Sequence, residues 1–300
     1  MGSATPPLTV GMPVYNGARY VADAIESILR QTYSDFEFII SDNASTDNTE
    51  EICRSYAAID RRIVYSRLAE NRGAAPNFNR VFLKNRSPFF KFAAADDVCA
   101  PHFLERCKTA YQHAPEDTVL CFPTTIKIDS EGRQQGILEE SMDLRQPEPH
   151  ARFRVFLLNY FYSNCFYGLL RAASYRSTRL HKSYHSADVV LLAELALRGQ
   201  FWQLDEPLLM RRFHEEMSHE ANPTPAKIRS WYDPSKRGTL AFPRIRMFWE
   251  FLGAIGTTPM STTERIRCGK ELVTVWIPKN WKRMAWDVVR NAGISIPRRS

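Results

Sequence analysis

The chain has 300 residues, of which 44% are hydrophobic and 24% charged, with 13 Gly and 18 Pro. This is the composition of a folded protein, and it excludes a disordered or fibrous one. Residues 201–300 hold 17 Lys and Arg against 10 Asp and Glu, so the net charge of +7 belongs to the last third of the chain. We expect any contact with an anionic partner there.

Three features of the sequence concern location. The opening segment MGSATPPLTV has no basic stretch followed by an apolar run, so no secretory signal is expected. The longest apolar stretch, residues 155–170, is interrupted by Asn159, Ser163 and Asn164, which argues against a membrane span. The six cysteines are scattered without a CxxC pair. We therefore expect reduced thiols, a cytoplasmic location and no zinc site.

Two kinds of segment alternate in the first half of the chain. Short runs rich in β-branched and aromatic residues predict buried strands at residues 8–14, 36–41, 63–67, 88–94 and 118–122. Helical spacing of apolar residues predicts helices at residues 18–31, 47–59, 75–86 and 101–114. This alternation predicts an α/β fold with a mostly parallel sheet flanked by helices.

The second half is less regular. Residues 130–150 are polar and rich in turn residues, which predicts a loop. Beyond it we expect strands at residues 165–170 and 207–213, with a helix at residues 188–198 between them.

A change of character follows Asn222, where the pattern becomes helical and aromatic. Five of the six tryptophans lie beyond residue 230. We therefore predict a main domain over residues 1–222, made of two halves that meet near residue 125. A helical, basic and aromatic-rich C-terminal extension is predicted over residues 223–300.

Polar residues follow three of the predicted strands directly. Pro13, Tyr15 and Asn16 follow the first strand, Asp42 ends the second, and Asp96-Asp97 comes after the fourth. In an open α/β sheet, ligands bind beyond the carboxyl ends of the strands, so these residues are expected to meet in one crevice.

The adjacent carboxylates of Asp96 and Asp97 are the strongest chemical signal. Two like charges at a strand end repel each other, and a divalent cation such as Mg²⁺ or Mn²⁺ removes that cost while bridging to substrate phosphates. The structural alternative is a solvated turn that caps the helix beginning at Pro101.

Asp42 has two possible roles as well. Its carboxylate can accept a hydrogen bond from a nucleobase or ribose, or it can serve as a turn or cap in the segment DNASTD. The sequence contains neither GxGxxG after the first strand nor GxxxxGK[ST], so the dinucleotide-binding and P-loop classes lose their main support.

Several spaced motifs together resemble one enzyme family. The run LTVGMPVYNGARYVADAIESILRQTYSDFEFIISDNASTDNT, followed by ENRGAAPNFNRVF and KFAAADDVCAP, resembles the family 2 glycosyltransferases, which are inverting enzymes of GT-A fold that use nucleotide-diphosphate sugars. The resemblance is dense over residues 8–105 and thinner over residues 188–218.

The resemblance implies specific contacts to the donor. It places four residues around the base and ribose: Pro13, Tyr15, Asn16 and Asp42. It makes Arg72 and Lys91 candidates for contacts to the nucleotide or its phosphates. The donor base is expected to be that of UDP or dTDP, with GDP as a further possibility.

The resemblance also implies a divalent cation, Mn²⁺ or Mg²⁺. Asp96 and Asp97 stand where the family has its metal-binding acidic pair, and His214 in RRFHEEMS stands where a histidine approaches the pyrophosphate or the metal. Many members have a further Asp two positions before the pair, where this chain has Ala94. We assign Asp97 to the metal and Asp96 to the ribose. Arg211 and Arg212 are candidates for the diphosphate, although strand alternation should send only one of them inward.

The general base of the family is an acidic residue that opens a helix in the second half. Asp188 in SADVVLLAELALRG matches this place, and Ser186 is a candidate cap for that helix. A helix N-terminus keeps a carboxylate ionised, as a base requires. The structural alternative is that acidic residues commonly occupy first helical turns. Many members have a second acidic residue before the base, where this chain has Ala187.

The implied activity is transfer of a sugar, with inversion, to a hydroxyl of a glycan, lipid-linked or other cell-envelope acceptor. The alternative is a non-catalytic nucleotide-sugar or glycan-binding protein of the same fold, and the Ala94 departure is what supports it. Nucleic-acid binding is not expected, because the chain has no recognition motif and its first two-thirds are near neutral.

Residues 262–291 form a basic and aromatic segment, with Trp276, Trp281 and Trp286 among four cations, Lys270, Lys279, Lys282 and Arg283. This composition is typical of a helix at a lipid surface, which would place the protein at the inner face of the membrane. The alternative is that the tryptophans pack on the domain and the cations are solvated. Pro278 predicts two short helices in place of one.

Overall fold

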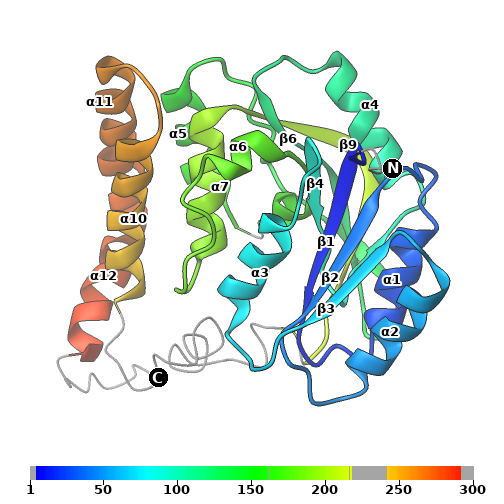
Figure 1. The fold of residues 1–300 in the computed structure, drawn as a ribbon. Coiled ribbons are helices and arrows are strands. Elements are labelled where there is room, and N and C mark those ends of the chain that lie inside the picture. The colour runs from blue at the N-terminus through cyan, green and yellow to red at the C-terminus, as the bar shows by residue number, and fades with distance from the viewer. Residues whose placement is uncertain (1–4, 162, 216, 218–241, 292–300) are drawn as a thin grey trace.

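The computed structural model describes residues 5–161, 163–215, 217 and 242–291. Within them a nine-stranded sheet carries helices on both faces (Figure 1). The strand order is β3-β2-β1-β4-β8-β6-β9-β5, and β7 pairs with β6 outside this path. The predicted α/β fold, a sheet flanked by helices, is confirmed. The sheet is mixed: four strand pairs are parallel, and the four that involve β5, β7 or β8 are antiparallel.

The first four strands of the sheet follow the predicted alternation. They are β1 (Leu8–Val14), β2 (Glu37–Asp42), β3 (Ile63–Arg67) and β4 (Phe89–Phe92), and their pairs are all parallel. The helices that connect them are α1 (Val21–Leu29), α2 (Thr49–Ile59) and α3 (Ala74–Leu83). Because the connections are helical crossovers, the carboxyl ends of β1, β2 and β4 lie at one edge of the sheet.

Alternation along the strands divides the apolar residues between two cores. Val10 and Ile40 face the core formed with α1 and α2, whereas Ile39 and Phe90 face the opposite core, which α3 covers. Successive side chains of a strand point to opposite faces, so each strand contributes to both cores.

The rest of the main domain adds five strands and several helices. The strands are β5 (Val98–Cys99), β6 (Thr118–Ile128), β7 (Gln134–Leu138), β8 (Leu169–Arg171) and β9 (Gln200–Arg212). The helices are α4 (Phe103–His113), α5 (Pro149–Asn159), α6 (Ala172–Arg176) and α7 (Ala187–Arg198), with a 3₁₀ turn at Asn164–Tyr167. Strand β8 runs antiparallel to both β4 and β6, and β9 is parallel to β6.

Some predicted boundaries in this part of the chain were wrong. Strand β7 occupies part of the predicted loop at residues 130–150, because a polar edge strand that pairs with β6 buries little and shows no hydrophobic alternation. The predicted strand at residues 165–170 is largely a 3₁₀ turn, with β8 after it. Strands β6 and β9 extend further than predicted because they pair along most of their length.

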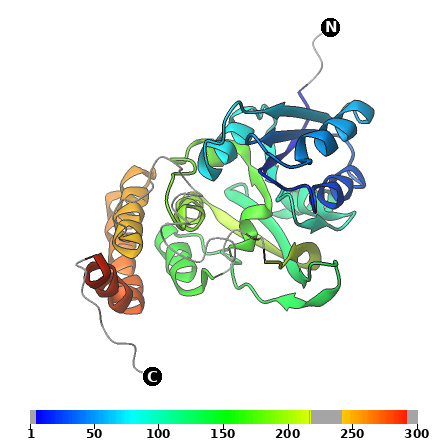
Figure 2. The same cartoon turned by 90° about the horizontal axis from the view of Figure 1, so that it is seen from below.

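The C-terminal extension is helical, as predicted, from residue 242 onward. Helices α10 (Pro243–Thr257), α11 (Thr262–Glu271) and α12 (Ile277–Asn291) form a separate layer beside α5 and α7 (Figures 1 and 2). The predicted domain boundary near residue 222 lies outside the described residues.

The predicted break at Pro278 was wrong. A π-helical turn at Leu272–Trp276 joins α11 to α12 without interruption. The wider turn comes directly before Pro278, where it accommodates the missing backbone donor of the proline. Among the described residues, no helix is long and apolar enough to span a membrane. All six cysteines are free and buried.

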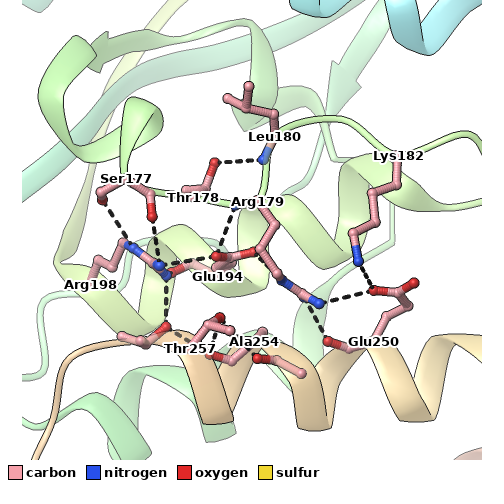
Figure 3. A network of polar contacts seen from close by, with 12 residues as sticks. Ser177, Thr178, Arg179, Leu180, Lys182, Glu194, Arg198, Glu250, Ala254 and Thr257 are labelled. Carbon is pink, nitrogen blue, oxygen red and sulfur yellow. Dashed lines mark hydrogen bonds and ion pairs between the residues drawn. The ribbon is translucent and has the colours of Figure 1, made fainter.

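A buried ion network attaches the extension to the main domain (Figure 3). Glu194 of α7 is 1% exposed and accepts hydrogen bonds from the backbone N and Nε of Arg179. It also pairs with Arg198 at 3.0 Å. Arg179 continues to the side-chain and backbone oxygens of Glu250 in α10, to which Lys182 also donates at 2.8 Å.

This network predicts the effect of Glu194→Gln. The change removes the carboxylate from two largely buried guanidinium groups, so the free energy of unfolding should fall by about 3 kcal/mol. Urea denaturation of the variant and of Glu51→Gln, an exposed acid on α2, measures the difference. Equal stability of the two variants would show that the network contributes little.

Candidate functional site

A cavity of about 710 Å³ lies at the carboxyl ends of the strands. It is lined by residues of the loop after β1, the loop after β2, the start of α3, the turn after β4 and the end of β9. The lining comprises residues 13–20 and 94–97 together with Asn43, Asp47, Asn71, Ala74, Asn77, Phe78, Tyr167, Arg211, Arg212, His214 and Met217. Pro13, Tyr15, Asn16, Asp96, Asp97 and His214 therefore come together, as the sequence predicted.

Hydrogen bonds hold the loop after β1 against the loop after β2. Asn16 has a left-handed φ of 50°, which Asn tolerates better than most residues, and its backbone N donates to Ser45 Oγ at 2.9 Å. Its Oδ1 accepts from Thr46 N at 2.8 Å. Tyr15, beside it, keeps 44% of its surface exposed at the cavity. The two loops therefore form one wall that presents an aromatic ring.

Asp42 lies behind this wall. It is fully buried, and its Oδ1 accepts from Ser45 N at 2.8 Å while its Oδ2 accepts from Tyr65 Oη at 2.8 Å and faces Arg67. The next residue, Asn43, lines the cavity in its place. In this position the Asp42 carboxylate shapes the loop, because its oxygens already have donors.

Three asparagines that sequence reasoning missed complete the wall. Asn43 Nδ2 donates to Asn71 Oδ1 at 2.9 Å, and Asn77 exchanges hydrogen bonds with the side chain and backbone of Ser41. Their signal in the sequence is weak, because Asn is common in turns. What distinguishes these three is a hydrogen-bond partner distant in the sequence, which only the folded structure shows.

The two predicted phosphate-binding cations do not line the cavity. Arg72 is exposed at its rim and pairs with Glu70 at 3.5 Å. Lys91 is buried below the sheet edge, where its Nζ donates to Phe92 O at 2.9 Å and lies 4.5 Å from the centroid of the Phe103 ring. From there its charge acts on Asp97, although the Lys91 side chain is not part of the cavity lining.

The acidic pair takes two different positions. Asp96 faces the cavity, and its Oδ2 lies 3.1 Å from His214 Nε2. Asp97 is 7% exposed, and its Oδ1 accepts from the backbone N of Arg212 at 2.9 Å. Burial raises the pKa of Asp97 to about 7, and the negative charge of Asp96 adds to the shift. Asp96 is therefore the more accessible of the two carboxylates.

Both arginines at the end of β9 reach the cavity, although strand alternation predicted only one. Arg212 is buried, donates from Nε to Asp96 O at 3.0 Å and pairs with Asp23 at 3.1 Å. The Nη1 of Arg211 donates to Asn164 Oδ1. The side chain of Arg212 thus connects β9 to the turn after β4 and to α1, whereas that of Arg211 contacts the 3₁₀ turn that begins at Asn164.

Asp188 is in the first turn of α7, outside the cavity lining but close to it. Its negative charge acts on Tyr167, which lines the cavity and whose pKa the charges of Asp97 and Asp96 also raise. Burial raises the pKa of Tyr167, and the charge of Asp97 adds to the shift. Ser186 stands at the N-cap position with a left-handed φ of 65°, and within the described residues its side chain accepts no capping hydrogen bond.

The family model described as "Glycosyl transferase family 2" matches residues 9–176, which include the whole wall of the cavity up to Tyr167. The chain belongs to this family. The resemblance read from the sequence is therefore confirmed.

Relatives in the family are similar over part of their length. The glycosyltransferase GlyG of Streptococcus pneumoniae is 29% identical over 113 residues, 38% of each chain. The putative teichuronic acid biosynthesis glycosyltransferase TuaG of Bacillus subtilis is 36% identical over 101 residues, 34% of this chain and 40% of TuaG. The chain thus spans less than half the length of these two relatives. An uncharacterized glycosyltransferase of Haemophilus influenzae is 26% identical over 75% of this chain and 72% of its own.

Solved structures share the fold. Residues 1–349 of Staphylococcus aureus TarS in complex with UDP-GlcNAc match with a TM-score of 0.68 at 16% identity, over 94% of this chain and 74% of that chain. The mannosyltransferase PcManGT of Pyrobaculum calidifontis, in complex with GDP-Man and Mn²⁺, matches with a TM-score of 0.53 at 13% identity, over 97% and 87%. This glycosyltransferase family 2 chain therefore has the predicted GT-A-type fold.

The protein side chains at this site fit a divalent cation only if a bound substrate supplies some of the cation's oxygen ligands. The described residues contain no group of three or more His, Cys, Asp or Glu side chains able to hold a metal. Asp96 and His214 are two donors at the cavity surface, with Asp97 beside them. A hard cation with few protein ligands typically completes its shell with substrate phosphates and water.

An unpartnered histidine supports the aromatic part of the cavity wall. His181 is 8% exposed, and its ring lies 5.0 Å from the ring of Phe78, which lines the cavity, and 5.2 Å from that of Phe166. Neither ring nitrogen has a hydrogen-bond partner among the described residues. Burial lowers the pKa of His181 from 6.5 to about 4, so the folded protein holds it neutral.

This histidine predicts a loss of stability in mild acid. The unfolded chain protonates His181 near pH 6.5, so its contribution is complete above that pH and is lost as the pH falls toward 4, by about 3 kcal/mol at most. His181→Phe should remove this part of the pH dependence. Urea denaturation at several pH values, with His113→Phe at an exposed position as the control, measures it. Parallel pH curves for native protein and His181→Phe would contradict the prediction.

Proposed function

We propose that the chain is an inverting glycosyltransferase that moves a sugar from a nucleotide-diphosphate donor to a hydroxyl of a glycan, lipid-linked or other cell-envelope acceptor. The observation that carries this proposal is the contact of Asp96 with His214 at a cavity that Tyr15 and four asparagines line, with Asp188 near enough for its charge to act on Tyr167. Nucleotide recognition, charge neutralisation and proton removal are the three parts of such a reaction, and each has candidate residues here.

The donor is proposed to lie with its base and ribose against the wall formed by Pro13, Tyr15, Asn16 and Asn43. An aromatic face and amide groups suit a nucleoside, because its base can stack on the ring and its polar groups need both hydrogen-bond donors and acceptors. The solved neighbours are complexes with UDP-GlcNAc and GDP-Man, which supports testing both bases.

The diphosphate is proposed to lie near Asp96, His214 and Arg211. When bound, Mn²⁺ or Mg²⁺ would act as a Lewis acid that stabilises negative charge on the leaving diphosphate. The exposure of the two carboxylates favours Asp96 with His214 as its ligands. This reverses the assignment expected from the sequence, because Asp97 is buried and bound to the backbone of Arg212.

Asp188 is proposed as the general base. Its place in the first turn of α7 keeps the carboxylate ionised, since the helix N-terminus favours negative charge. Asp188 takes the proton of the acceptor hydroxyl while the hydroxyl oxygen attacks the anomeric carbon. The bond to the diphosphate breaks on the opposite face, so the configuration inverts.

Asp188→Asn tests the base. Turnover should fall by roughly 10²- to 10⁴-fold, the usual contribution of general-base catalysis, while nucleotide binding is unchanged. The measurement is transfer or hydrolysis of UDP- and GDP-sugars with Mn²⁺, beside Glu51→Gln as an equivalent first-turn acid on α2. Nucleotide binding without turnover in the native protein would identify a binding protein of the same fold instead.

Nucleotide-dependent thermal stability tests the cation site. A nucleoside diphosphate at about 100 times its Kd raises the free energy of unfolding by about 2.7 kcal/mol, and we expect Mn²⁺ to increase that gain. Asp96→Asn and His214→Ala should abolish the increase from Mn²⁺ and keep part of the gain from nucleotide. His113→Ala, at an exposed histidine, should behave like the native protein. Retention of the Mn²⁺ effect in both site variants would refute this cation site.

A further inference from the structure

We propose that the outer surface of α10 and α12 docks on an anionic lipid surface. This docking surface consists of Trp249, Trp281, Lys282, Arg283, Trp286 and Val288. The inference deepens the proposed function and rests on it in one respect, namely that the docked protein takes its acceptor hydroxyl from that membrane.

The inner side of α12 already has its contacts, which are polar as well as apolar, with Ile277 and Met284 packed on the core. Asp287 is buried and accepts from the backbone N of Arg244 at 2.7 Å, at the beginning of α10. Asn280 is buried as well and donates to Trp276 O at 3.0 Å. Trp276, just before α12, is fully buried and donates to Tyr160 Oη at 2.9 Å. The packing of the helix therefore does not use its other two tryptophans.

Large apolar side chains remain on the outer side of the extension. Trp281 is 55% exposed, Trp286 50% and Val288 50%, and Trp249 of α10 is 64% exposed. A shallow hollow beside Trp249 is lined by Phe242 and Ile245, among others. Exposed tryptophans gathered on one element are uncommon on a surface that meets only water, since each leaves a large apolar area hydrated.

The charges around these tryptophans select the partner. Lys282 and Arg283 are exposed and take part in no ion pair among the described residues, and the Nζ of Lys282 lies 5.7 Å from the Trp281 ring centroid. Asp287 is the one acidic residue in the sequence of α12, and it points inward to α10. The outer side is thus cationic and aromatic, the combination that binds the interface of a membrane with anionic lipids.

The same charges argue against a second copy of this chain. A symmetric dimer through this surface would bring Lys282 and Arg283 of both copies together, with no carboxylate of α12 on the outer side to neutralise them. An anionic lipid surface removes that repulsion and accepts the tryptophans at the level of its headgroups.

The position of the docking surface fits the use of a membrane-bound acceptor. Helix α12 runs toward the same end of the molecule as the carboxyl ends of β1 and β2, where the cavity lies (Figure 1). The first residues of α10 are at that end too (Figure 1). The extension therefore reaches the end of the molecule at which the cavity lies.

Co-sedimentation of the full chain with lipid vesicles tests the proposal. Vesicles of phosphatidylcholine that contain phosphatidylglycerol should bind the protein, and vesicles of phosphatidylcholine alone should bind it at least about tenfold more weakly. High salt should release the protein. Lys282→Glu/Arg283→Glu should weaken binding at least about tenfold, and Trp281→Ala/Trp286→Ala should also weaken it.

Matched controls separate docking from general charge and hydrophobicity. Arg61→Glu/Arg86→Glu makes the same change of charge at exposed positions of the main domain, and Ile59→Ala removes an exposed apolar side chain from α2. Both should bind vesicles like the native protein. Equal binding to the two kinds of vesicle, or native binding by the docking-surface variants, would overturn the proposal. A dimer that these variants dissociate, without vesicle binding, would assign the surface to a second copy and also overturn it.

The proposed function is tested separately on the same variants. Stabilisation by UDP or GDP with Mn²⁺ should be unchanged by the docking-surface substitutions, because these residues lie outside the cavity lining. Vesicle binding without nucleotide stabilisation would leave the docking surface valid and the proposed enzyme refuted. The opposite result would refute the docking surface alone.

Discussion

The structure depends on one buried cation, Arg212. It lies at the end of β9, and its backbone N holds the Asp97 carboxylate while its guanidinium binds Asp96 O, Ser130 O and the Asp23 carboxylate. These contacts join β9 to the turn after β4 and to α1, which are far apart in the sequence. The positive charges of Arg211 and Lys91 act on the buried Asp97 and offset part of its repulsion with Asp96.

The carboxylates of the site divide into those that hold its loops in place and those for which we propose a part in the reaction. Asp42 and Asp97 are buried and receive hydrogen bonds from neighbouring backbone, so each fixes the path of a loop. Asp96 lies at the surface of the cavity beside His214, and Asp188 lies in the first turn of α7, from where its charge acts on Tyr167. The buried carboxylates thus fix the loops that carry the more accessible ones, and groups fixed in this way suit a site that binds charged ligands.

The C-terminal extension is part of the same mechanical unit as the candidate base. Helix α10 packs on α7, and the network of Arg179, Glu194 and Glu250 crosses their interface (Figure 3). Whatever the extension contacts on its outer side is therefore connected, through buried ion pairs, to the helix that begins at Asp188. The proposed docking surface and the helix that carries the candidate base therefore keep a fixed relative position.

The sequence by itself determined the alternation of strands and helices, because side-chain periodicity is a local property. Its spaced motifs determined the family, and with it the expectation that Tyr15, Asn16, Asp96, Asp97 and His214 meet at the strand ends. Tertiary structure alone decided which of these groups faces the cavity. In the folded chain Asp42 and Lys91 are buried, Asp97 is more deeply buried than Asp96, and the polar residues of β7 form a strand. Those outcomes depend on partners more than twenty residues away, such as Tyr65 for Asp42 and Arg212 for Asp97, or on pairing along a neighbouring strand. A local pattern specifies that a side chain is polar, whereas its burial and its hydrogen-bond partners are set by the packing of distant segments.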